Sequence, residues 1–153
     1  MATTELGIYF PTEGTNADFV SIFSTLANSI NDAISQFTYD SGWIVVSQNE
    51  MSNSWEPYNS TGSHVRYRKI GKITYLDGII RYGTGTDVFT LPEGFRPKGV
   101  WPNFAAPIID TGSGSNNNAR IRVTTAGVVQ AYVASQSLRD EGVGLSAVAF
   151  VSE

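Results

Sequence analysis

The 153-residue sequence contains no cysteine and a single histidine, His64. Without cysteine there is no disulfide, thiolate zinc site, iron–sulfur cluster or cysteine nucleophile. A catalytic triad or a histidine metal site would therefore depend on His64. Ser63 adjoins it, but neighbouring residues of a strand point to opposite faces and do not form a nucleophile–base pair. We therefore expect no metal site and no enzyme of these classes.

Charged residues are also scarce, at 16% of the chain, compared with about 25% in an average soluble domain. No Lys or Arg precedes Arg66, and the net charge is −4. Nucleic-acid binders need clustered basic residues to contact phosphates, so we expect no nucleic-acid partner. The acidic first part is interpreted as solvated surface, and a separate acidic module is the alternative.

No stretch of the sequence has the character of a targeting or membrane segment. The start, MATTELGIYFP, has neither a basic n-region nor an apolar h-region. No apolar run approaches the ~20 residues that cross a membrane. We expect a soluble protein without a signal peptide and without membrane insertion.

Residues 16–38 have the periodicity of an amphipathic helix. Thr15 can cap its start, and Asp18 follows three residues later, where a carboxylate faces free backbone N–H groups. The apolar residues are spaced alternately four and three apart, as in a coiled-coil seam. They are Phe19, Phe23, Leu26, Ile30, Ala33 and Phe37. No second helix is predicted to cover this stripe, so we expect it to join copies of the chain. Packing on its own domain is the alternative.

From Gly42 onward the pattern changes to short apolar runs bounded by Gly, Pro, Asn and Asp. Gly71 is expected to form a tight hairpin turn, residues 121–129 a second hairpin, and Gly78 a bulge. Strands without intervening helices predict an antiparallel β-sandwich of the jelly-roll kind. The predicted strands are Trp43–Ser47, Val65–Ile70, Ile73–Tyr82, Val88–Leu91, Val100–Phe104, Arg120–Thr124, Val128–Val133 and Val143–Val151.

Three longer polar stretches, residues 48–64, 110–118 and 134–142, separate these strands. Binding residues are often found in loops on a rigid β-scaffold. Aromatic rings can stack on sugar faces while polar side chains bind the hydroxyls. Trp43 and Trp101 lie in strand-like runs, where a core position suits them at least as well. The predicted saccharide-binding residues are Trp55, Tyr58, His64, Asp110, Asn116, Asn117, Arg139 and Asp140.

Two short motifs have the form of catalytic or nucleotide-binding loops. Asp110-Thr111-Gly112 matches half of an aspartic-protease site, but two such loops are needed to share one proton, and the second is missing. The glycine-rich segment 83–86 lacks the Lys and the following helix of a phosphate loop. Glycoside hydrolysis needs two facing carboxylates, and the sequence singles out no pair. We therefore expect a non-enzymatic protein without a cofactor.

Three segments resemble the C-terminal domains of bacteriophage tail-fibre and baseplate receptor-binding proteins. They are VRYRKIGKITYLDG (65–78), FTLPEGFRP (89–97) and the hairpin RIRVTTAGVV (120–129). The start LGIYFP (6–11), followed by a helix, is similar to the N-terminus of many short tail proteins. These motifs are turns and strands of the scaffold, and they identify no ligand-binding residue.

The resemblance implies a homotrimer on the virion, at the phage tail tip or baseplate. A short N-terminal helix would form a stalk or shoulder below a β-sandwich head that binds a host cell-surface or cell-wall saccharide. We expect an attachment segment at 1–15, which would join other tail or baseplate proteins, an oligomerisation segment at 16–38 and a head at 41–153. The alternatives are a structural tail component without a receptor of its own or, third, a saccharide depolymerase.

Overall fold

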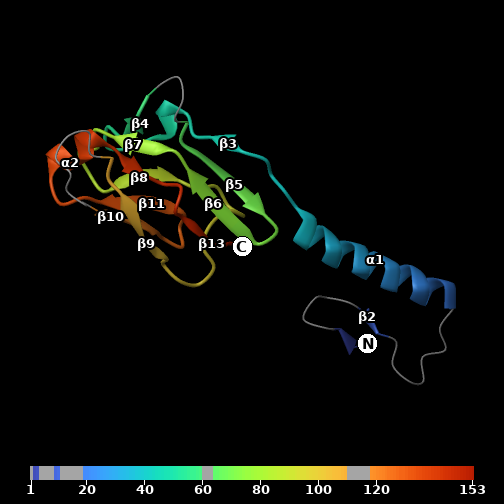
Figure 1. Ribbon diagram of the computed structural model, residues 1–153. Helices are drawn as coiled ribbons and strands as arrows, with labels where there is room; N and C mark the ends of the chain where they lie inside the picture. Colours follow the sequence, from blue (N-terminus) through green and yellow to red (C-terminus); the bar gives the residue numbers. More distant parts are fainter. Residues whose placement is uncertain (1, 4–8, 11–18, 60–63, 110–117) are drawn as a thin grey trace. The chain divides into compact units, whose positions relative to one another are not determined.

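The computed structural model describes residues 2–3, 9–10, 19–59, 64–109 and 118–153 (Figure 1). The chain divides into two units, Met1–Tyr39 and Asp40–Glu153. Within the described part, no helix combines the length and the apolar character needed to cross a membrane.

The first unit contains helix α1 (Phe19–Thr38) and a short antiparallel pair formed by β1 (Ala2–Thr3) and β2 (Tyr9–Phe10). The predicted capping residues, 15–18, lie outside the described residues. From Phe19 to Thr38 the predicted helix is confirmed. Several large apolar side chains of α1 are 40–71% exposed, namely Val20, Phe23, Ile30, Ile34 and Phe37. Ala33 is buried, Leu26 is half-buried, and the side chain of Phe19 lies outside the description.

In its described residues the second unit, called the head below, holds three antiparallel sheets. The first has the strand order β8-β11-β10-β9, the second β12-β7-β4 and the third β13-β6-β5-β3. The strands are β3 (Ile44–Val45), β4 (Glu56–Pro57), β5 (Arg66–Ile70), β6 (Ile73–Asp77), β7 (Ile79–Arg81), β8 (Asp87–Thr90), β9 (Asn103–Pro107), β10 (Asn118–Val123), β11 (Val128–Tyr132), β12 (Val143–Gly144) and β13 (Ala149–Val151).

All three sheets contribute side chains to one hydrophobic core. Ile121 of β10, Ile80 of β7 and Leu76 of β6 are each no more than 2% exposed. In β10 buried and more exposed residues alternate, as expected where one face of a sheet packs on a core and the other faces solvent. The predicted fold class, mainly β with an N-terminal helix, is confirmed.

Two glycines shape the third sheet. The hairpin between β5 and β6 turns at Gly71, whose φ of 58° suits a residue without Cβ, as predicted. Gly78 has a φ of 112°, and a Cβ there would lie 2.4 Å from the carbonyl oxygen of His64. The expected bulge is a complete break: the chain leaves the third sheet at Asp77 and enters the second at Ile79.

The polar stretches and the last predicted strand contain structure that the sequence analysis does not predict. Residues 48–64 include a 3₁₀ turn, η1 (Gln48–Glu50), and strand β4. Residues 134–142 include the short helix α2 (Gln136–Glu141), in which Ser135 Oγ accepts a hydrogen bond from the N–H of Leu138 at 3.4 Å. The predicted strand 143–151 is two strands, β12 and β13, because the N–H of Val148 turns back to the carbonyl of Leu145.

Candidate binding site

Trp55, the foremost predicted sugar-stacking residue, is completely buried in the core of the head. Its indole Nε1 donates a hydrogen bond to the carbonyl of Gly85 at 3.0 Å, which satisfies its one polar atom. An enclosed indole offers no face to a ligand, so the prediction for Trp55 is wrong. The three polar residues before it, Ser52 to Ser54, are exposed, whereas Trp55 itself points inward from the end of this turn.

The other two tryptophans differ from expectation in the opposite direction. Trp43 is 40% and Trp101 53% exposed, although both lie in runs that suit a core strand. Each stands just before a strand, Trp43 ahead of β3 and Trp101 ahead of β9. Residues outside a strand do not follow its alternation between core and solvent. Both indoles therefore lie at the surface of the head.

Two predicted site residues, Tyr58 and Arg139, lie near the same segment of β7. The Arg81 guanidinium is 5.1 Å from the centre of the Tyr58 ring and 4.4 Å from that of Tyr82. Arg139 Nη1 donates to the carbonyl of Gly83 at 3.3 Å, and the carbonyl of Arg139 accepts from the N–H of Tyr82. Both residues are half-buried, and these bonds give Arg139 a role in joining α2 to the sheet (Figure 1).

The remaining predicted site residues do not form a cluster in the described structure. His64 is exposed just before β5, and its carbonyl lies against Gly78. Asp140 is exposed on α2 and accepts a hydrogen bond from Gln136 Nε2 at 3.1 Å. Asp110, Asn116 and Asn117 lie outside the described residues.

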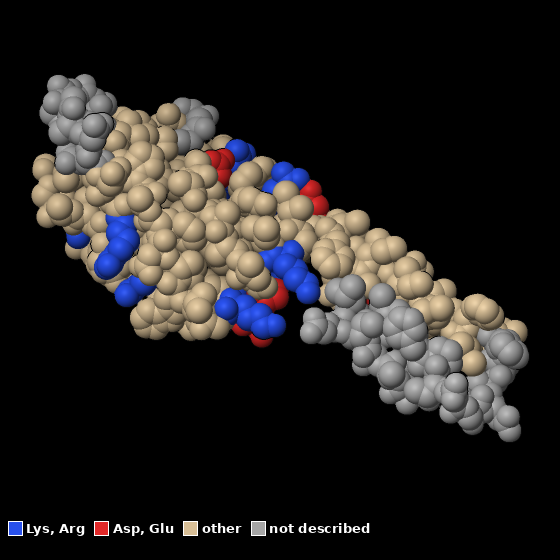
Figure 2. Space-filling view, turned by 60° about the horizontal axis from the view of Figure 1, so that its bottom comes forward, with Lys and Arg blue, Asp and Glu red and all other residues tan. Residues whose placement is uncertain are grey.

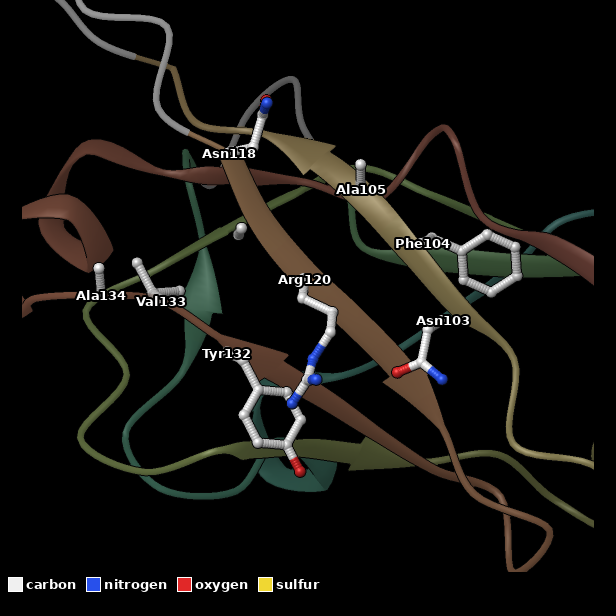
Figure 3. Close-up of a pocket in the computed structure, with 9 residues that line it drawn as sticks. Asn103, Phe104, Ala105, Asn118, Arg120, Tyr132, Val133 and Ala134 are labelled. Carbon is white, nitrogen blue, oxygen red and sulfur yellow. The ribbon is translucent and has the colours of Figure 1, made fainter.

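A shallow groove of about 580 Å³ lies on the outer side of strands β9, β10 and β11 (Figure 3). Because β10 alternates, Ala119 and Ile121 point into the core while Arg120 and Arg122 point outward. The antiparallel register places Arg120 opposite Tyr132 and Arg122 opposite Gln130. Arg120 and Tyr132 line the groove, together with Asn103, Phe104, Asn118 and Val133.

Guanidinium and aromatic groups stack beside one another along this outer face. The Arg120 guanidinium carbon lies 4.1 Å from the Tyr132 ring centre. Figure 3 shows the guanidinium of Arg120 next to this ring. Arg122 lies 5.0 Å from the same ring and 4.9 Å from the ring of Trp101. Each stack contributes roughly 0.5–1 kcal/mol at an exposed site and restricts the motion of long side chains. The order of groups is therefore Trp101, Arg122, Tyr132, Arg120.

Hydrogen bonds fix the orientation of Arg122. Its Nε and Nη2 donate to Gln130 Oε1 at 2.9 and 2.7 Å, and Nη2 also donates to the hydroxyl of Tyr132. The amide of Gln130 is itself oriented, since its Nε2 donates to Asp87 Oδ1 at 2.7 Å. The network Asp87–Gln130–Arg122–Tyr132 thus spans three strands and holds the groove's edge in one arrangement.

A second hollow, of about 330 Å³, lies on the outer face of the third sheet beside Trp43 and Asp77. Its charged groups are paired. Asp77 accepts from Ser146 Oγ at 2.6 Å and binds Arg66 Nη2 at 2.7 Å, and these contacts hold its pKa below the usual value. Arg68 donates to both carboxylate oxygens of Asp40 and lowers the pKa of that acid to about 2.

The groove combines flat ring faces with several N–H donors, a combination that binds ring-shaped polar ligands. Asn103, Arg120, Arg122 and Tyr132 are not among the site residues predicted from the sequence. One signal was available: in Arg120-Ile121-Arg122-Val123 polar and apolar residues alternate, which places both arginines on the solvent face of a strand. Across residues 19–59, 64–109 and 118–153, no His, Asp and Glu side chains gather in a group that could hold a metal ion.

No protein-family model matches the chain, and no curated protein matches it. Among solved structures, the receptor binding protein gp15 of Listeria phage PSA is similar, with a TM-score of 0.56 and 19% identity. The similarity covers 91% of this chain and 82% of that chain. At this identity it shows a shared fold, which agrees with the resemblance to phage receptor-binding proteins seen in the sequence.

Proposed function

We propose that this chain is a phage receptor-binding protein of the virion tail. It attaches the virion to a host cell-surface saccharide and is not an enzyme. The observation that carries the proposal is the shared fold with the gp15 receptor binding protein over 91% of this chain. The phage-like motifs of the sequence lie in that same fold.

The groove on β9–β10–β11 supports a saccharide as the ligand. Trp101 offers an exposed indole beside the groove, while Asn103 and Asn118 bring amide groups to the groove and its margin. Sugars bind proteins through such stacking combined with hydrogen bonds to hydroxyls. The predicted loop residues Tyr58, His64, Asp110, Asn116, Asn117, Arg139 and Asp140 remain secondary candidates.

The homotrimer is part of the same proposal and is supported by α1. Large apolar side chains along the helix are exposed within the described structure, at 64% for Phe23 and 58% for Phe37. Burying such side chains between copies removes apolar surface from water, at roughly 25 cal/mol for each Å². Three heads on one assembly would strengthen weak individual sugar contacts through high effective concentration.

A binding assay tests this proposal. The purified full chain, labelled with a fluorophore, is mixed with cell-wall fragments from a panel of bacteria, and retained protein is measured beside competition with phage adsorption. We expect retention on walls of a susceptible strain, reduced about tenfold or more by Trp101→Ala with Tyr132→Ala, since the exposed indole and the ring that orients Arg120 are both lost. Retention on no wall would favour a structural tail component, and release of reducing sugar would favour a depolymerase.

A further inference from the structure

We propose that the groove on β9–β10–β11 takes a saccharide chain that carries negative charge, with Arg120 as the residue that meets the anion. The charged group is a carboxylate or a phosphodiester on the glycan, since both are planar or forked acceptors for a guanidinium. This inference rests on the proposed function and specifies the ligand of its site.

The arginines of the head differ in whether an acid neutralises them. Arg66, Arg68 and Arg81 form ion pairs with Asp77, Asp40 and Glu56. Neither Arg120 nor Arg122 takes part in an ion pair with a described residue. The chain as a whole is acidic, at −4, and Figure 2 shows its basic side chains scattered, several beside acidic ones. Arg96 and Arg139 also form no ion pair with a described residue, but they donate to backbone carbonyls, those of Leu91 and Gly83. Arg120 and Arg122 differ in lying at successive outward positions of one strand, beside the groove, with no described acid partner.

Arg120 is held in place while its donors stay open. Its side chain is exposed and stacks on the Tyr132 ring at 4.1 Å, and it makes no hydrogen bond within the described residues. The ring fixes the plane of the guanidinium, so the N–H groups at its edge point away from the stack. A stacked guanidinium with free edges is preorganised for an anion, because little side-chain entropy remains to be lost on binding.

Arg122 completes the positive site from the next outward position of β10. Its donors to Gln130 and Tyr132 meet uncharged oxygens, so its charge is not cancelled by them. The carboxylate of the network, Asp87, lies beyond Gln130 and accepts from Gln130 Nε2 and, at 3.3 Å, from Thr86 Oγ1. Asp87 therefore orders the amide that orders Arg122 but forms no ion pair with that arginine.

The second hollow provides the contrast. There Arg68 is paired with Asp40, and Arg66 is paired with Asp77, so the guanidinium groups near Trp43 are already neutralised. An anion arriving at that hollow would have to displace a carboxylate, whereas no carboxylate of the described residues would have to be displaced at Arg120. The charge preference thus belongs to the groove on β9–β10–β11 rather than to exposed aromatics in general.

Nuclear magnetic resonance titration of the ¹⁵N-labelled full chain tests this inference, using three probes. They are a galacturonic acid tetramer, the same tetramer fully methyl-esterified, and an oligomer of glycerol phosphate. The side-chain N–H signal of Arg120 and the indole signal of Trp101 report on the groove, and the buried indole of Trp55 is the internal control. We expect a charged oligomer to shift the groove signals and the methyl ester to bind about tenfold more weakly, as for loss of one charge-assisted contact. Comparison of the two charged probes shows whether a carboxylate or a phosphodiester is preferred.

Two variants with the same change of charge make the test specific. Arg120→Gln should weaken binding of the charged probe about tenfold. Lys98→Gln, on an exposed loop outside the groove, should leave that binding unchanged. Added salt should also weaken binding of the charged probe, because exposed charges are screened within about 10 Å at 0.1 M ionic strength. Equal binding of the acid and its methyl ester, equal effects of the two variants, or no groove shift with either charged probe would each overturn the inference. Retention on bacterial walls that still depends on Trp101 would then leave the proposed function standing.

Discussion

The indole of Trp55 lies against the backbone of Gly83, so closely that a Cβ on Gly83 would be 1.9 Å from the indole Cε2. Gly83 is needed for space and not for a left-handed backbone, since its φ is not positive. The carbonyl of the same residue accepts a hydrogen bond from Arg139 on α2. A glycine between the two therefore lets the largest core side chain and a surface helix pack at one point of the chain.

Gly83→Ala should destabilise the head by about 1–3 kcal/mol, because the added methyl overlaps the indole and forces a shift of backbone or ring. Urea unfolding followed by circular dichroism measures the change. In a Trp55→Phe background the same substitution should cost less, since the smaller ring leaves room for the methyl. Additive effects of the two substitutions would contradict the contact as the cause.

Trp55 and Trp101 should separate stability from binding. Trp55→Ala removes a fully buried ring and should cost roughly 3–5 kcal/mol. Trp101→Ala removes a half-exposed ring and should change the free energy of unfolding by less than about 1 kcal/mol while weakening retention on bacterial walls. Should Trp55→Ala prevent folding, acrylamide quenching of the Trp43→Phe/Trp101→Phe variant gives the same information. A readily quenched Trp55 would contradict its burial.

Gln130→Met should loosen the groove without disturbing the core. Arg122 loses the Oε1 acceptor of two hydrogen bonds, and Asp87 loses a donor, at a cost of about 1–2 kcal/mol in stability. Gln130 is a positioning residue, so retention on walls should fall further than stability does. The Nε–H signal of Arg122 should broaden or shift, and Thr90→Val, an exposed change in the same sheet, should leave that signal in place. An unmoved Arg122 signal in Gln130→Met would refute the positioning role.

Acid should destabilise the head below about pH 4. Among the described residues, three carboxylates have a lowered pKa in the folded protein: Asp40 at about 2, held mainly by Arg68, Asp77, held mainly by Ser146, and Glu50, held mainly by Ser47. A lowered folded pKa contributes stability above the unfolded pKa and loses it as the pH falls through the folded value.

The midpoint of urea unfolding should therefore decrease between about pH 4 and pH 2. The Asp77→Asn variant should be less stable than the parent at pH 7 and should lose less stability on acidification. The Glu93→Gln variant, which changes an exposed acid, should follow the parent curve. Parallel curves for Asp77→Asn and the parent would contradict the contribution of Asp77.

The proposed oligomer depends on the apolar stripe of α1. Phe23→Asp with Ile30→Asp should dissociate the trimer, because each new charge would be buried without a partner at the helix seam. Multi-angle light scattering measures the mass. Ser24→Asp with Asn28→Asp adds the same two charges to exposed polar positions and should leave the mass unchanged. A monomeric parent chain would rule out the trimer itself.

Local patterns in the sequence were sufficient for the helix and most strands. The spacing from Phe23 to Phe37 predicted α1, and the run through Gly71 predicted the β5–β6 hairpin with its positive φ. These features depend on contacts within a few residues, so periodicity and turn chemistry determine them. The shared fold of the head was also anticipated, because its scaffold turns carry recognisable residues.

The candidate groove was not anticipated, because it depends on which strands become neighbours. Arg120 and Tyr132 are adjacent through the register of a hairpin, but Asp87 and Asn103 reach the same face from the two flanking strands. The polar sequence around Trp55 predicted a surface position for this residue. In the structure the chain turns there, and the indole points into the core. Such reversals arise because burial depends on contacts between residues far apart in the chain.

The sequence by itself determined the chemistry that this protein lacks and the local elements it forms. Absent cysteine and a single histidine remove whole classes of site, and residue spacing defines helix and hairpins over short distances. Only the tertiary structure decided which tryptophans are buried and which are exposed, and which arginines form an ion pair with a carboxylate. Those outcomes depend on the pairing of three sheets around one core, where each side chain's neighbours come from distant segments.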